Sequence, residues 1–180
     1  MVGEIRDKET AQLAVQAALT GHLVFSTIHT NSAAGIIPRL IDMGVDPYLI
    51  APTLILTMAQ RLVSRICGGG NPIPVEGGLK EMIDKQFQDL PDEYKKDIPT
   101  TDTVLQAVPS PECPKGTRGR MGAFEVFKTT RDLERVILSK PSSEEIWKIV
   151  RKDGMTTMRE DAIIKALKHE VPFEEINSLI

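Results

Sequence analysis

Short apolar runs alternate with helical patterns near the N-terminus. Residues 1–5 (MVGEI) and 22–28 (HLVFSTI) are rich in Val, Leu, Ile and Phe, which predicts two short strands, the second of them buried. Residues 10–19 are Ala-rich and favour a helix, and Gly21 follows at a position where glycine commonly ends one. This order is typical of an α/β unit built on a parallel sheet.

Two more helices are expected before the composition changes. The first lies between residues 31 and 43, with an Asn or Ser as its cap and Gly44 after its last turn. Asp46, which is followed by a proline, predicts the start of the second. We expect that helix to run to about Ile66.

Residues 67–78 (CGGGNPIPVEGG) mark a boundary, because Gly and Pro interrupt both helices and strands. Beyond it the pattern predicts mostly helices, with one alternating strand at residues 122–127 (GAFEVF). We divide the chain into an α/β part over residues 1–66, a linker with a cysteine-containing insertion over 67–128, and a helical lobe over 129–180. The expected helices cover residues 79–90, 101–108, 131–139, 142–151, 156–168 and 173–179.

The composition is that of a globular protein without a nucleic-acid or membrane signature. Of the 180 residues, 41% are hydrophobic and 26% are charged, and the net charge of −3 gives no positive field that would attract nucleic acid. No apolar run approaches the ~20 residues of a membrane span, and the charges near the N-terminus argue against a secretory signal peptide. Cys67 and Cys113 fit a reducing compartment better than a disulfide framework. We therefore expect a cytoplasmic protein with no transmembrane segment and no nucleic-acid partner.

Charged and polar side chains lie at the ends of both predicted strands. Glu4, Arg6 and Asp7 surround the end of the first run, and Thr27 and His29 that of the second. Ligands of open α/β sheets bind outside the carboxyl ends of the strands, so an acid here can hold Mg²⁺ or polarise an attacking water. A histidine there can hydrogen-bond a phosphate oxygen. For Glu4 taken alone, a solvated acid at a strand end is an equally good interpretation.

His22 precedes the second predicted strand instead of following it. At ~3.3 Å per residue it would lie roughly 20 Å from His29, so the two side chains cannot bind one phosphate from the same strand. Their spacing does not support a zinc site either. The residues alone therefore suggest that His22 is structural or lies at a subunit contact.

Several segments together resemble a family of motor proteins. VGEIRD at residues 2–7 resembles the Walker B box, and TGHLVFSTIHT at residues 20–30 the histidine box, of the secretion ATPases of type II secretion and type IV pilus assembly. The AQRLV segment and the tail sequences at residues 119–127 and 154–176 also resemble this family. The likeness follows the family's order along nearly the whole chain, except for a gap from about residue 68 to residue 111.

The resemblance implies a fold and a cellular setting. The fold would be α/β, the second half of a RecA-like P-loop NTPase core followed by a mostly helical C-terminal lobe. The complete enzyme would use ATP and Mg²⁺ as a homo-hexamer in the bacterial cytoplasm. It would associate peripherally with the inner membrane through a platform protein of a secretion or pilus machine.

The resemblance also implies roles for individual residues. Glu4 would be the Walker B glutamate, which orders Mg²⁺ and the attacking water, and His29 would sense the γ-phosphate. His22 would be the first histidine of its box, while Arg6 would lie near the nucleotide or the neighbouring subunit. Asp7 and Thr27 would also lie near these groups.

Two departures from the family pattern limit this assignment. No GxxxxGK[ST] sequence occurs in the chain, so a phosphate-binding loop and its lysine are absent from these residues. Many family members also carry two CxxC pairs that bind zinc. Cys67 and Cys113 would be remnants of such pairs, and two thiolates cannot complete a tetrahedral zinc site by themselves. We therefore expect no zinc.

We interpret the sequence as the C-terminal part of such an ATPase, with an N-terminal part missing and little activity on its own. The alternative is a non-catalytic remnant or binding module that docks on a partner ATPase subunit. A DNA-binding adaptor built on the tail helices is less attractive, because the last 50 or so residues are too acidic.

Overall fold

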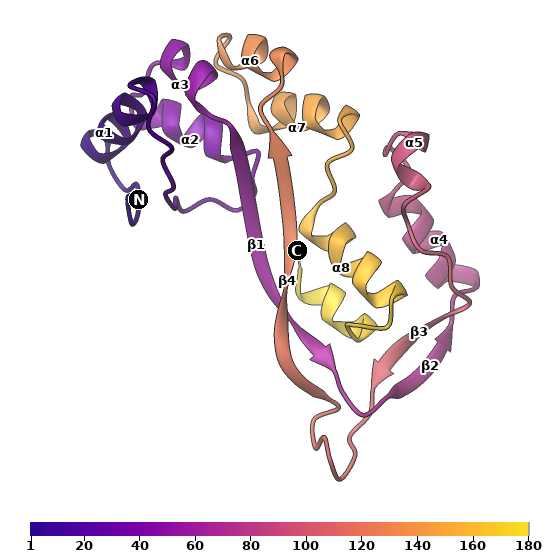
Figure 1. The fold of residues 1–180 in the computed structure, drawn as a ribbon. Coiled ribbons are helices and arrows are strands. Elements are labelled where there is room, and N and C mark those ends of the chain that lie inside the picture. The colour runs from indigo at the N-terminus through magenta and orange to yellow at the C-terminus, as the bar shows by residue number, and fades with distance from the viewer. Residues whose placement is uncertain (180) are drawn as a thin grey trace. The chain divides into compact units, whose positions relative to one another are not determined.

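The computed structural model describes residues 1–179 (Figure 1). Its contacts divide the chain into two units. The first unit comprises Met1–Ala59 and Val126–Met155, and the second comprises Gln60–Glu125 and the chain from Thr156 onward. The boundary falls within two long strands, β1 (Leu56–Ile66) and β4 (Thr117–Lys128), which pair with each other.

Five helices build the first unit. Helix α3 contacts α1, α2 and α6, and α6 contacts α7. The core between them consists of fully buried aliphatic side chains, including Ile37, Ile50, Leu133, Ile137 and Ile146. The helices are α1 (Lys8–Leu19), α2 (Ile36–Asp42), α3 (Pro47–Thr53), α6 (Arg131–Ile137) and α7 (Ser143–Lys152).

Capping residues fix where several of these helices begin. The side chain of Asp7 accepts a hydrogen bond from the backbone N–H of Thr10, and the side chain of Asp46 accepts one from that of Tyr48. Ser142 and Glu145 form a capping box at the start of α7. The starts of α3 and α7 agree with the sequence patterns, whereas α1 begins at Lys8, two residues before the expected helix, and α2 begins about four residues later than its expected cap.

The prediction of a buried strand over residues 22–28 is wrong. This run meets residues 1–5 through one parallel bridge, between Ile5 and Ile28, and neither run is a regular strand. Leu23 and Phe25 are 68% and 63% exposed. Among the described residues no further strand pairs with either run. The bridged pair, Ile5 and Ile28, still packs against the core of the first unit, whereas Leu23 and Phe25 lie on the surface.

The prediction of a helix from residue 47 to residue 66 is also wrong beyond Thr53. The chain leaves α3 at Leu54 and continues as strand β1. Thr57 and Val63 are both buried, and their even spacing places them on the same face of the strand. The partner strand β4 lies far along the chain, so pairing with it overrides the local helical pattern.

The second unit contains a two-stranded antiparallel sheet and a helical layer. Strand β2 (Gly70–Pro74) pairs with β3 (Thr103–Ala107) in the register Gly70↔Ala107 to Pro74↔Thr103. The prediction of a helix over residues 101–108 is therefore wrong, and the Gly- and Pro-rich boundary contains a strand. The helical elements are α4 (Gly77–Gln86), α5 (Asp92–Lys95), α8 (Met158–Leu167) and the 3₁₀ helix η1 (Phe173–Ser178).

The core of the second unit joins these elements. Val104 of β3 and Ile83 of α4 pack in one cluster with Ala162 and Ile163 of α8. Figure 1 shows α8 and η1 (yellow) near strand β3, which both elements contact. In the part of the chain that the structure describes, no helix has the length and apolarity needed to cross a membrane.

Candidate functional site

The bridge between Ile5 and Ile28 aligns the two N-terminal runs in parallel. Two backbone hydrogen bonds accompany it, from the N–H of Val2 to the carbonyl of Phe25 (2.9 Å) and from the N–H of Ile5 to the carbonyl of Thr27 (2.8 Å). Side chains alternate along extended chain, so the residues on either side of the bridged pair share the opposite face. The residues that flank the bridge are thus brought together.

Glu4 contacts both Arg6 and His29. His29 Nε2 lies 2.9 Å from Glu4 Oε1, and Arg6 Nη2 lies 2.6 Å from Glu4 Oε2. Glu4 is the most enclosed of the three, with 20% of its side chain exposed against 75% for Arg6 and 89% for His29. The hydrogen bond from Arg6 lowers the pKa of Glu4 below its ordinary value, against the opposing effect of partial burial. Glu4 is therefore a carboxylate at neutral pH.

One oxygen of Glu4 retains an unused acceptor position. Oε1 is shielded from solvent and accepts no hydrogen bond from the described residues. The His29 ring is close enough to this oxygen for an ion pair, although the contact does not have hydrogen-bond geometry. A carboxylate oxygen of this kind can accept a hydrogen bond from water or coordinate Mg²⁺, which commonly uses one or two protein carboxylates together with waters and phosphates.

The other candidate residues make local backbone contacts. Asp7 caps α1, and the backbone hydrogen bond from Thr10 lowers the pKa of its carboxyl. Thr27 donates a hydrogen bond to the carbonyl of Gly3 at 2.8 Å, which helps to hold the two runs together. His22 lies at the other end of α1, where its Nδ1 is 3.2 Å from the carbonyl oxygen of Ala17. The structure thus brings together Glu4, Arg6 and His29, while their chemical roles remain predictions.

Cys67 and Cys113 are joined in a disulfide, with their Cα atoms 6.3 Å apart. The expectation of two free thiols is therefore wrong, because the turn between β3 and β4 brings Cys113 back to the end of β1, a contact that cysteine spacing cannot reveal. No group of three or more His, Cys, Asp or Glu side chains suited to a metal occurs among residues 1–179.

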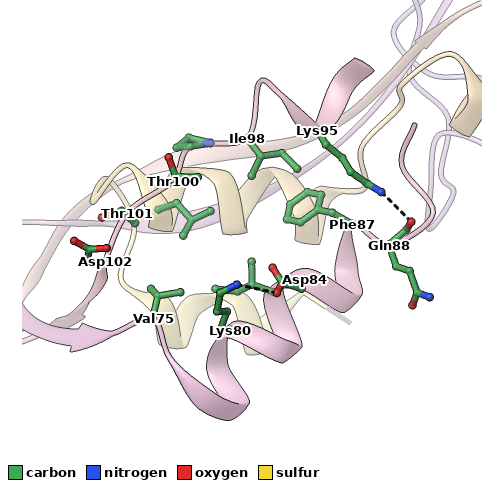
Figure 2. A pocket seen from close by; sticks show the side chains of 13 residues that line it. Val75, Lys80, Asp84, Phe87, Gln88, Lys95, Ile98, Thr100, Thr101 and Asp102 are labelled. Atoms are coloured by element: carbon green, nitrogen blue, oxygen red, sulfur yellow. Dashed lines mark hydrogen bonds and ion pairs between the residues drawn. The ribbon is translucent and has the colours of Figure 1, made fainter. Parts of the chain in front are cut away.

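The second unit also contains a pocket that the sequence did not indicate (Figure 2). It has a volume of about 900 Å³, and Ile83, Phe87 and Ile98 are among its apolar lining residues. Lys80 forms an ion pair with Asp84 at 3.3 Å on its wall. The helical spacing of Ile83 and Phe87 predicts a buried face of α4, but no pattern indicated that the face would be only partly filled. All its lining residues belong to the second unit, whereas Glu4 and His29 belong to the first.

Comparisons with known proteins give one consistent result. The family described as Type II/IV secretion system protein matches residues 1–178. The chain is 38% identical over 180 residues to the type IV pilus assembly ATPase PilB of Pseudomonas aeruginosa and 41% identical over 177 residues to the type II secretion system ATPase E of Vibrio cholerae. Each match covers 98% of this chain, and the chain spans 30% and 33% of these relatives, about a third of their length.

Solved structures agree on the fold. The pilus retraction motor PilT with bound ADP superposes with a TM-score of 0.62 at 21% identity, covering 99% of this chain and 38% of that one. The ATPase DotB of Legionella pneumophila superposes with a TM-score of 0.60 at 18% identity, covering 98% and 37%. At such identities the likeness concerns the fold alone. Because the family match extends over nearly the whole sequence, the chain belongs to the type II/IV secretion system protein family.

Proposed function

We propose that this chain is part of an ATPase that powers type II protein secretion or type IV pilus assembly. The relatives at 38% and 41% identity carry these two functions in their names. The contact between Glu4 and His29 is the observation that carries the proposal, because it joins the VGEIRD segment to the histidine-box segment. A solvated acid at a strand end would need neither the histidine nor a shielded oxygen.

Glu4 is the residue that prepares the attacking water. Arg6 keeps its carboxylate ionised, and the free acceptor position on Oε1 can take a hydrogen bond from that water or bind Mg²⁺. Bound ATP and Mg²⁺ would supply the phosphoryl group and neutralise its developing charge. His29, which is largely exposed beside Glu4, would hydrogen-bond a phosphate oxygen and link it to the Glu4 carboxylate.

The remaining parts of the nucleotide site do not come from these residues. The chain has no GxxxxGK[ST] loop, whose backbone N–H groups and lysine would hold the phosphates. We propose that regions of the family protein outside the third spanned here supply that loop. These residues then form the second half of a RecA-like core and a helical C-terminal lobe, within a homo-hexamer.

The same proposal implies where the complete protein works in the cell and what it binds. The complete protein works in the cytoplasm, attached peripherally to the inner membrane through the platform protein of the secretion or pilus machine. A non-catalytic binding module remains the second candidate, favoured by the lack of a phosphate-binding loop in these residues. The two proposals differ in one respect: an ATPase that contains this sequence should hydrolyse ATP if the first is right and should not if the second is right.

A chimera tests the proposal. This chain would replace the matching third of the Vibrio cholerae relative, to which it is 41% identical, and ATP hydrolysis would be measured with the purified protein. We expect the chimera to hydrolyse ATP within about tenfold of the rate of the parent enzyme. A tenfold change in rate corresponds to a change of ~1.4 kcal/mol in the activation barrier. A folded hexamer that binds ATP but does not hydrolyse it would favour the binding module instead.

A further inference from the structure

The disulfide closes the base of a lobe that carries the pocket. Cys67 directly follows β1, and Cys113 lies 46 residues further on, in the turn before β4. Strands β2 and β3 and helices α4 and α5 all lie between the two cysteines. So do all the pocket-lining residues except Leu167. We call residues 67–113 the clasped lobe.

Backbone contacts hold both cysteines in place independently of their sulfur atoms. The N–H of Cys113 donates to the carbonyl of Ser110 at 3.1 Å, and its carbonyl accepts from the N–H of Ser110 at 2.9 Å. The N–H of Cys67 donates to the carbonyl of Gly116 at 3.1 Å. A Cα separation of 6.3 Å falls within the range that a disulfide spans. The two reduced thiols would therefore remain near enough to each other to form the disulfide again.

The two cysteine residues differ in exposure to solvent. Cys113 is 3% exposed, whereas Cys67 is only partly buried. A small thiol or disulfide in solution therefore reaches Cys67 first, and Cys113 acts as the resolving partner. This asymmetry is common among reversible cysteine pairs, in which one thiol exchanges with solution and the other completes the reaction.

We propose that Cys67 and Cys113 form a reversible redox clasp that controls how often the clasped lobe opens. With a low-molecular-weight disulfide as oxidant, the Cys67 thiolate attacks one of its sulfurs, which forms a mixed disulfide and releases one thiolate. The Cys113 thiol then loses its proton to solvent and attacks the Cys67 sulfur. The Cys67–Cys113 bond forms, the second small thiolate leaves, and two electrons have passed from the protein to the oxidant.

Opening would change the pocket, because the lobe supplies nearly all of its wall. In the reduced state the lobe is held by the β2–β3 pairing and by the packing of residues such as Ile83 and Val104 on α8. In the oxidised state the cross-link also limits the freedom of the opened lobe, which disfavours opening by roughly 100- to 1,000-fold for a closed loop of this length. The proposal does not depend on ATPase activity, since the clasp and the lobe both lie in this chain.

Hydrogen exchange on this chain tests the proposal in buffers of reduced or oxidised glutathione, with free thiols counted by mass after maleimide labelling. We expect two free thiols in the reduced buffer and none in the oxidised one. The backbone amides of β2 and β3 should exchange at least tenfold faster in the reduced chain. The amides of α7, which lies in the first unit, should exchange equally in both buffers.

Matched variants separate the clasp from a general effect of the buffer. The Cys67→Ser and Cys113→Ser variants should exchange like the reduced wild type in both buffers, and the Ser110→Ala variant should keep the redox response. Two free thiols under oxidised glutathione would overturn the proposal, as would a disulfide that leaves exchange of β2 and β3 unchanged. Equal loss of protection in α7 would also overturn it, because the effect would then not be specific to the clasped lobe.

Discussion

Glu4 Oε1 and His29 Nε2 lie 2.9 Å apart on two runs that are joined by a single parallel bridge. The contact depends on the register of that bridge, because a shift of one residue would turn one of the two side chains to the opposite face. Thr27 supports the register through its hydrogen bond to the carbonyl of Gly3. The local backbone thus determines whether acid and histidine meet.

Arg6→Gln should raise the pKa of Glu4, because the hydrogen bond from Arg6 is the largest cause of its lowered value. His29→Ala should raise it less, since the charge of His29 is a smaller cause. A carbon-13 NMR titration of the Glu4 carboxyl would measure both changes. Asp7 is the internal control, because its pKa is lowered mainly by the backbone of Thr10 and should not change.

The sign of the pH dependence follows from the direction of this shift. A carboxyl whose pKa is lower in the folded chain stabilises it at pH values above the unfolded pKa, near 4.3 for Glu. That contribution disappears as the pH falls through the folded pKa. An unchanged Glu4 titration in Arg6→Gln would show that the ion pair does not form in solution.

Ser142→Ala should destabilise the first unit by about 1 kcal/mol, because it removes the capping box of α7. Urea unfolding at neutral pH would measure the loss. Ser143→Ala is the control, since Ser143 is the first residue of the helix and its side chain has no part in the box. Backbone hydrogen bonding to Ser142 lowers the pKa of Glu145, so the effect should shrink at acidic pH. Equal effects of the two substitutions would contradict the capping geometry.

Leu133→Ala should cost about 2–5 kcal/mol of unfolding free energy, because it leaves a cavity in a core where Leu133 is fully buried. Leu138→Ala, at the end of the same helix, provides the comparison, since that side chain is 40% exposed. We expect its cost to be less than about 1 kcal/mol. Similar midpoints of denaturant unfolding for the two variants would place α6 outside the core.

Local signals predicted the helices of this chain better than its strands. Asp7, Asp46 and Ser142 mark helix starts through contacts within three residues, which a sequence pattern can reveal. Residues 56–66 and 103–107 form strands because distant partners pair with them. Such pairing depends on tertiary contacts that hydrophobic spacing does not encode.

The candidate site also divides into features that local sequence signals predict and features that depend on tertiary contacts. Polar residues at the ends of two apolar runs were sufficient to predict that Glu4 and His29 lie near one edge. The contact of Arg6 with Glu4 could not be derived from spacing, since both side chains could equally face solvent. The disulfide between Cys67 and Cys113 depends on the return of the chain through β3, which the sequence pattern placed in a helix.

ATP turnover of the chimera carrying Glu4→Gln tests the central claim most directly, with Glu9→Gln, an exposed acid in the first turn of α1, as the matched control. The account predicts a loss of about 100-fold or more for Glu4→Gln, with ATP binding preserved and the control unchanged, because the variant cannot take a proton from the attacking water. Normal turnover by Glu4→Gln would contradict the assignment of Glu4 and, with it, the proposed role of the site.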